Sequence, residues 1–185
     1  MNNKRLIYDQ QSMAITINRL CFQLIEDHHQ FVDSVILGLQ PKGIFLADKI
    51  QKILKSNFNI ETQVGYLDIT FNRDDFRRRD LSIVPSEMKV PFSIENKKVI
   101  LIDDVLYSGR TIRAALDSML SFGRPASVDL LVLINRKYTR ELPIEPKYVG
   151  KSVNTLQSEK VLVELVEQDY STDAIWLVNK ENSTN

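Results

Sequence analysis

The chain has 185 residues, of which 43% are hydrophobic and 26% charged, and its 24 basic and 24 acidic side chains give a formal net charge of zero. This length suits one globular domain with a sizeable core, and the single Cys21 excludes an intrachain disulfide and a cysteine-based zinc site. The balanced charge argues against a protein that binds nucleic acid through net charge alone, although it leaves room for a local basic patch.

No stretch indicates a membrane segment or an export signal. The longest apolar run, Leu130 to Ile134, is far shorter than the ~20 residues that a spanning helix needs. Residues 1–9 are polar and lack the apolar core of a signal peptide. We therefore expect a cytoplasmic, single-domain protein over residues 1–185, with a polar, disordered tail at 179–185.

The first third of the chain alternates between helical and strand patterns. Apolar residues at three-to-four-residue spacing predict a helix from Gln10 to His29. Val35 to Leu37 predicts a short buried strand, and a second amphipathic helix is expected from Ile44 to Leu54. Strand character returns from Val64 to Ile69.

For three further residues the sequence predicts a structural environment and no functional role. Cys21 lies beside the apolar stripe of the first helix and is expected in the core. His28 and His29 stand at the polar end of that helix, and we expect both to be solvated.

Between Phe71 and Phe92 the periodicity fails. Arginines and aspartates crowd together there, and Pro85 and Pro91 prevent a continuous strand. Unstructured connections longer than ~12–15 residues are uncommon in compact domains, and many are lids or binding loops. Two interpretations stay open for this segment: a flexible loop that covers a ligand, or a solvated surface excursion.

The second half predicts a parallel crossover unit. Val99 to Ile102 is a continuous apolar strand, Thr111 to Phe122 has helical spacing, and Val128 to Ile134 is a further apolar strand. Two weaker strands, Val161 to Val166 and Ala174 to Val178, close the chain. The predicted fold is therefore α/β, with a mostly parallel central sheet flanked by helices.

The residues after Ile102 suggest a binding site, because ligands bind at the carboxyl ends of strands in such sheets. Asp103 and Asp104 come first, and a short segment with Ser108 and Gly109 then leads into a helix. A helix N-terminus offers unpaired backbone N–H groups to a phosphate, whereas two carboxylates suit sugar hydroxyls or a Mg²⁺ ion. A phosphorylated sugar with a metal-bound second phosphate would satisfy both. The alternative is a strand end followed by an ordinary helix cap.

The segment VILIDDVLYSGRT, Val99 to Thr111, closely resembles the phosphoribosyl-pyrophosphate (PRPP) motif of type I phosphoribosyltransferases. Further segments resemble the PyrR family, whose members attenuate pyrimidine operons and are also uracil phosphoribosyltransferases. These segments are DITFNRDD (68–75), DDVLYSGRTIRAALD (103–117), FGRP (122–125), RELPI (140–144) and YVGK (148–151). The resemblance extends from about Arg19 to Leu165, and it implies the type I fold, with a flexible loop at 71–92 and a small hood.

The resemblance also implies roles for single residues. Asp103 and Asp104 would be catalytic, holding the ribose hydroxyls directly or through Mg²⁺, and Arg136 would approach the diphosphate or the base. The 5′-phosphate would lie in the loop of Tyr107, Ser108, Gly109, Arg110 and Thr111, and Val105 and Leu106 before it would also belong to the PRPP site. The diphosphate would meet the loop Pro41, Lys42 and Gly43, and Arg73 and Arg77 after loop closure. The family usually has Thr-Arg where this chain has Pro41-Lys42, which removes an N–H donor and a bidentate guanidinium.

The activity implied is Mg²⁺-dependent transfer of phosphoribose from PRPP to uracil by a homodimer or higher homo-oligomer. Two alternatives stay open: an RNA-binding attenuation regulator that senses uridine nucleotides, and a phosphoribosyltransferase for another base. The family's basic face for a messenger RNA leader corresponds to Arg19, Arg140 and Lys151. Phe22 and Glu145 stand where the family commonly has His and Arg, so we expect regulation through RNA to be impaired or absent even if catalysis is retained.

Overall fold

The computed structural model describes residues 4–69, 89–156 and 158–179. Within these ranges five strands form a central sheet in the order β3-β2-β4-β5-β6, and every neighbouring pair is parallel. These strands are β2 (Ser34–Leu39), β3 (Gln63–Leu67), β4 (Lys98–Leu106), β5 (Ser127–Lys137) and β6 (Tyr148–Asn154). A second, antiparallel sheet in the order β1-β8-β7, which we call the hood, consists of β1 (Lys4–Tyr8), β7 (Glu159–Glu164) and β8 (Ala174–Asn179).

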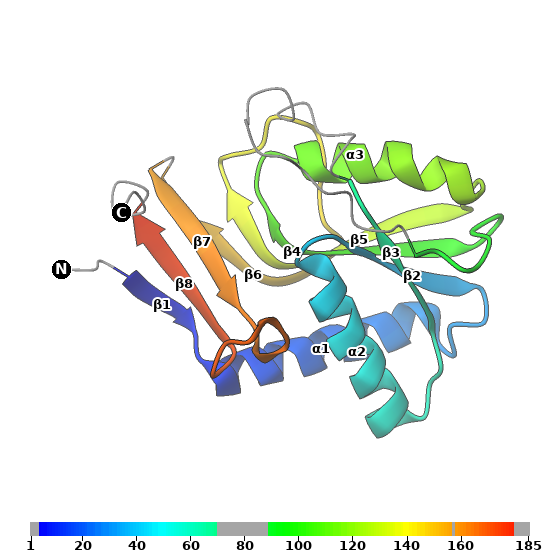
Figure 1. The fold of residues 1–185 in the computed structure, drawn as a ribbon, viewed down its shortest axis with the longest axis horizontal. Coiled ribbons are helices and arrows are strands. Elements are labelled where there is room, and N and C mark those ends of the chain that lie inside the picture. The colour runs from blue at the N-terminus through cyan, green and yellow to red at the C-terminus, as the bar shows by residue number, and fades with distance from the viewer. Residues whose placement is uncertain (1–3, 70–88, 157, 180–185) are drawn as a thin grey trace.

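Helices cover both faces of the central sheet, as Figure 1 shows with α3 above the sheet and α1 and α2 below it. Their bounds are Gln10–His28 for α1, Gly43–Phe58 for α2 and Arg110–Met119 for α3, and 3-10 turns lie at Leu120–Phe122 and Val166–Gln168. In β4, Ile100 packs with the α1 and α2 side of the core, whereas Leu101 packs with the α3 side. Burial on both faces explains the continuous apolar run of this strand and confirms the predicted α/β architecture.

The strand register brings several loops to one edge of the sheet. Gly38 near the end of β2 pairs with Ile102, and Leu106 at the end of β4 pairs with Asn135 in β5. The segments that follow β2, β4 and β5 therefore leave the sheet at its carboxyl edge, where α/β sheets bind ligands. None of the helices within the described residues is long and apolar enough to cross a membrane.

Two strands were missed by the sequence patterns, β1 and β6. Both lie at the edge of a sheet and carry several exposed residues, so neither shows the apolar run that revealed the inner strands. The predicted tail was wrong at its first residue, because Asn179 ends β8, and residues 180–185 lie outside the described part. Most of the predicted flexible loop, residues 71–88, also lies outside the described part. Lys89, just after it, forms an isolated antiparallel β-bridge with Tyr66.

His28 corrects an expectation, since its side chain is buried rather than solvated. Its Nδ1 lies 2.9 Å from Ser34 Oγ and its Nε2 lies 3.0 Å from the hydroxyl of Tyr148. That hydroxyl donates to Asp27 at 2.7 Å, and Asp129 lies 3.5 Å from His28 Nε2. The cluster joins the end of α1 to the first residues of β2 and β6, at the edge of the sheet opposite the loops described above.

Burial lowers the pKa of His28 below its usual range, although the nearby carboxylates oppose this shift. Below pH ~6.5 the unfolded chain therefore binds a proton that the folded chain resists. We expect the free energy of unfolding to fall as the pH drops from 6.5 toward the folded pKa, by at most ~1.4 kcal/mol per pH unit. Above pH ~6.5 the contribution of His28 to stability is complete.

Urea unfolding at pH 7.5 and pH 5.5 checks this expectation. His28→Gln should lose part of the pH dependence of the wild-type protein. His29→Gln is the matched control, because it makes the same substitution at the next residue, whose side chain is exposed. If the free energy of unfolding depended on pH identically in His28→Gln and the wild type, the lowered pKa of His28 would be contradicted.

Candidate functional site

Asp103 and Asp104 lie within β4, which runs four residues further than the sequence patterns indicated. Asp103 is 8% exposed, and its Oδ1 accepts the backbone N–H of Asp104 at 2.9 Å. Burial raises the pKa of Asp104, and the charge of Lys42 opposes that shift. The pair thus combines a fixed carboxylate with a desolvated one beside a cation.

The loop after β2 reaches this pair through Gly43, the first residue of α2. A Cβ atom at Gly43 would lie 2.3 Å from the carbonyl oxygen of Ile102 and 3.1 Å from the Cα of Asp103. Only glycine allows the start of α2 to approach the backbone of β4 so closely. The ammonium of Lys42 donates to the carbonyl of Val163 in β7 at 2.9 Å, which links this loop to the hood.

The segment after β4 forms a turn that starts α3. Gly109 has φ +93°, a conformation that favours glycine, and it precedes the first helical residue. The helix has no side-chain cap, and Ser108 Oγ accepts the N–H of Arg110 at a long 3.4 Å. Such a start leaves backbone N–H groups toward an anion. Leu106, by contrast, is buried in the core, so its side chain is not available to a ligand.

Residues 139–144, which we call the strap, cross this turn. The guanidinium of Arg140 donates to the carbonyl of Tyr107 and, at 2.7 Å, to Asn135 Oδ1. The backbone N–H groups of Glu141 and Leu142 donate to the carbonyl of Ser108 at 3.0 and 3.2 Å. Burial lowers the pKa of Arg140, and Glu145 opposes this shift.

Arg136 is 4% exposed and donates to three groups, two in the residues just after β6 and one in the first residue of β7. These are Thr155 Oγ1 at 2.8 Å and the carbonyls of Leu156 and Glu159 at 3.2 and 3.1 Å. Its guanidinium also lies 4.2 Å from the ring centroid of Tyr107. Burial lowers its pKa. The structure therefore places Arg136 at the junction of β5, the hood and the turn after β4.

The remaining predicted residues divide into two groups. The structure brings the loop 41–43, the aspartate pair and the segment 105–111 to the same edge of the sheet. Arg73 and Arg77 lie outside the described residues. The strap was the feature that sequence reasoning missed, because it depends on bonds between residues about 33 positions apart.

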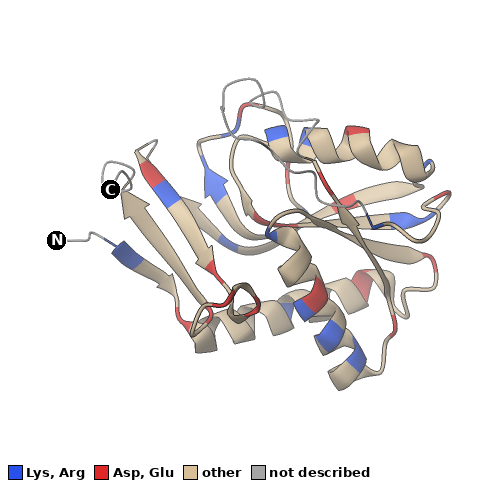
Figure 2. Ribbon diagram, in the orientation of Figure 1, with Lys and Arg blue, Asp and Glu red and all other residues tan. Residues whose placement is uncertain are grey.

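The three residues predicted for an RNA face do not share one set of contacts. Arg19 donates to the carbonyls of Val149 and Gly150 at 3.1 and 2.6 Å, and Tyr8 donates to the same Gly150 carbonyl at 3.4 Å. The ammonium of Lys151 lies 4.9 Å from the ring centroid of Tyr8. Arg140, in contrast, is bonded to the turn after β4. Figure 2 shows basic and acidic residues interspersed over the ribbon.

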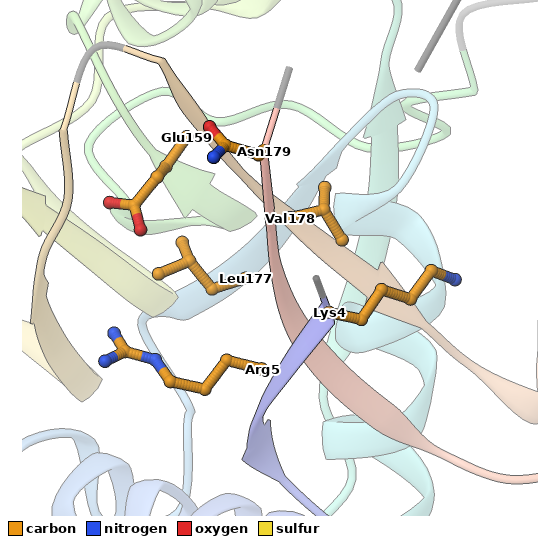
Figure 3. A pocket seen from close by; sticks show the side chains of 6 residues that line it. All are labelled: Lys4, Arg5, Glu159, Leu177, Val178 and Asn179. Carbon is orange, nitrogen blue, oxygen red and sulfur yellow. The ribbon is translucent and has the colours of Figure 1, made fainter. Parts of the chain in front are cut away.

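A cavity of about 230 Å³ lies on the hood, lined by Lys4, Arg5, Glu159, Leu177, Val178 and Asn179. Figure 3 shows Arg5, Leu177 and Glu159 projecting to one side of the hood and Lys4 and Val178 to the other. None of the predicted site residues lines it. The cavity is therefore separate from the aspartate pair.

A magnesium ion fits the donor set that the structure offers. The described residues contain no group of three or more His, Cys, Asp or Glu side chains that could hold a metal. Mg²⁺ is commonly held by one or two carboxylates, with water and substrate phosphates as the other ligands. Asp103 and the desolvated Asp104 meet this requirement.

Comparisons with known proteins agree with this geometry. Residues 5–168 match the family described as phosphoribosyl transferase domain. The bifunctional protein PyrR of Brevibacillus brevis is 41% identical over 91% of this chain and 94% of its own length. The bifunctional protein PyrR of Bacillus velezensis is 37% identical over 98% of this chain and 100% of its own length.

Solved structures show the same fold. A hypoxanthine phosphoribosyltransferase from Staphylococcus aureus has a TM-score of 0.71 at 20% identity and covers 98% of this chain and 94% of its own. A complex of the enzyme HGPRT-ase of Leishmania tarentolae with GMP has a TM-score of 0.71 at 16% identity. The match covers 97% of this chain and 98% of that enzyme's chain. At these identities the likeness concerns the fold alone.

Proposed function

Because the chain belongs to the phosphoribosyltransferase family, with PyrR proteins among its relatives, we propose that it transfers phosphoribose from PRPP to uracil. The products are UMP and diphosphate. One observation carries the proposal. The pair Asp103 and Asp104, the turn at Gly109 that starts α3 and the loop at Gly43 that starts α2 lie at the carboxyl edge of the parallel sheet. A sugar that carries one phosphate and one diphosphate requires these groups for binding.

Each part has a distinct task in this proposal. Asp103 and Asp104 accept the ribose hydroxyls or hold Mg²⁺ through water, and the turn 107–111 binds the 5′-phosphate. The start of α2, with Lys42, faces the diphosphate. No covalent nucleophile is needed, because the bond from C1 to the diphosphate loosens as positive charge develops on the ribose. Bound Mg²⁺ would offset the negative charge of the departing diphosphate.

Base specificity is tested by supplying the purified protein with PRPP, Mg²⁺ and one base at a time. We expect formation of UMP and diphosphate with uracil, and at least tenfold slower turnover with hypoxanthine, guanine or orotate. Faster turnover with one of those bases would overturn uracil as the substrate. No nucleotide with any base would overturn the proposed transferase activity.

A second function, binding of a messenger RNA leader of pyrimidine genes, is favoured by the exposed Arg19 and Lys151 beside Gly150. The PyrR relatives are described as bifunctional. Two features oppose strong binding. The guanidinium of Arg140 is bonded to the carbonyl of Tyr107, and Glu145 lies near it. Phe22, which stands where the family commonly has His, packs edge-on against Phe58 with ring centroids 5.1 Å apart. We propose that RNA binding is retained only weakly in this cytoplasmic protein.

Replacing Glu145 with Arg should strengthen RNA binding, because it exchanges a charge that repels phosphate for one that attracts it. A gel-shift titration with the host's pyrimidine leader RNA at ~0.15 M salt should show at least ~threefold tighter binding for Glu145→Arg. Glu61→Arg is the matched control, since Glu61 is exposed and precedes β3, the far edge of the sheet. Tight binding by the wild type that UMP strengthens would contradict the proposal.

A further inference from the structure

We propose that Arg140 is a positioning residue of the transfer reaction: through the strap it holds the turn 107–109 in the shape that receives the 5′-phosphate. This inference rests on the proposed function, because it needs that turn to bind a phosphate. It gives Arg140 a task inside the enzyme site, whereas the family resemblance had placed this residue on an RNA face.

The position of Arg140 at the end of the sheet is the first argument. The β4–β5 ladder ends with the pair Leu106 and Asn135. Tyr107 is the next residue of the chain, and Arg140 donates both to its carbonyl and to Asn135 Oδ1. One guanidinium thus continues the connection between the two strands for one residue after the backbone ladder has stopped.

The direction of the peptide groups is the second argument. The strap donates hydrogen bonds to the carbonyls of Tyr107 and Ser108. Arg140 and, at a long 3.5 Å, the hydroxyl of Thr139 donate to the first, and two backbone N–H groups donate to the second. In a planar trans peptide the carbonyl and the following N–H point in opposite directions. The N–H groups of Ser108 and Gly109 therefore point away from the strap. That is the orientation in which successive backbone N–H groups can bind an anion.

Close packing of the strap against Gly109 is the third argument. A Cβ atom at Gly109 would lie 3.3 Å from Ile144 Cδ1, 3.4 Å from Leu142 Cβ and 3.6 Å from Arg140 Cδ. The turn is consequently enclosed on the strap side. If Arg140 releases the carbonyl of Tyr107, only the long 3.5 Å contact with the Thr139 hydroxyl remains there. The peptide group between Tyr107 and Ser108 then gains freedom to rotate, and the 5′-phosphate loses a preorganised donor.

Lysine cannot replace this arginine fully. A guanidinium offers donors on a rigid planar fork and can reach two acceptors at once, whereas an ammonium acts as a single point charge. Arg140→Lys keeps the positive charge and removes the bridge between the two acceptors. Arg140→Gln removes both. Arg113→Gln is the matched control, because Arg113 is an exposed arginine of α3 whose side chain lies near Asp117.

The test separates the two ends of the substrate. Calorimetric titration with UMP measures binding at the 5′-phosphate turn, and titration with diphosphate and Mg²⁺ measures binding at the loop after β2. For both Arg140 variants we expect about tenfold weaker UMP binding, or ~1.4 kcal/mol, and a similar rise in KM for PRPP. We expect unchanged diphosphate affinity and, for Arg113→Gln, unchanged binding of both ligands.

The outcomes distinguish the inference from the function on which it rests. If the wild type binds neither UMP nor PRPP, the proposed function fails and the role of Arg140 with it. If the wild type binds UMP and the Arg140 variants bind it equally well, only the positioning role is overturned. Equal loss of UMP and diphosphate binding in Arg140→Lys would also overturn it, because general damage to the fold would affect both ends.

Discussion

Asp103→Asn and Asp104→Asn should each lower the PRPP-dependent turnover at least tenfold, which corresponds to about 1.4 kcal/mol of activation free energy. Each change removes a negative charge that would face the ribose hydroxyls or Mg²⁺. The fold should persist, because the amide oxygen of an asparagine at 103 can still accept the backbone N–H of Asp104. At 104 the change removes a desolvated charge, so it should not lower the free energy of unfolding.

Turnover and urea unfolding should be measured together on these variants. Asp117→Asn is the matched control, because this aspartate of α3 is exposed and loses the same charge. Wild-type turnover in both Asp103→Asn and Asp104→Asn would show that the reaction occurs elsewhere. Loss of turnover in Asp117→Asn as well would show that turnover depends on the total charge of the protein and not on the two aspartates of the site.

Gly43→Ala should be the most damaging small substitution near the site. Its Cβ would lie 2.3 Å from a backbone oxygen, and the backbone of β4 cannot move aside as a flexible side chain can. We expect a loss of ~2–3 kcal/mol in the free energy of unfolding, typical of overpacking at a tight contact. Turnover should fall more than tenfold, because the start of α2 must move away from Asp103.

Gly65→Ala provides the comparison for this variant. A Cβ at Gly65 would lie 3.0 Å from a flexible methyl group of Leu37 and 3.1 Å from the carbonyl of Lys89, both more tolerant distances. We expect a smaller loss of stability there. If urea denaturation found Gly43→Ala as stable and as active as the wild type, the close approach of α2 to β4 would be disproved.

The inner elements of the fold could be predicted because hydrophobic spacing reports burial directly. β4 and β5 are buried on both faces and show continuous apolar runs, whereas the edge strands β1 and β6 are half exposed and show none. The extension of β4 through Asp103 was missed for a related reason. Polar residues at the carboxyl edge of a buried strand look like the start of a loop.

The candidate site was predictable as far as its residues are consecutive. The aspartate pair and Gly109 lie in one short segment, and their chemistry could be read from it. Contacts between distant segments could not be read in this way. The burial of His28 depends on Ser34 and Tyr148, and the role of Arg140 depends on Tyr107. No periodicity of a single sequence encodes such pairs.

A crystal structure of the protein with UMP, diphosphate and Mg²⁺ tests the central claim most directly. The account predicts the 5′-phosphate on the backbone N–H groups of 108–111, with the ribose hydroxyls or the metal at Asp103 and Asp104. The diphosphate should lie at the start of α2, beside Gly43. A nucleotide bound instead in the hood cavity between Arg5 and Glu159, with the aspartate pair uncontacted, would contradict the account.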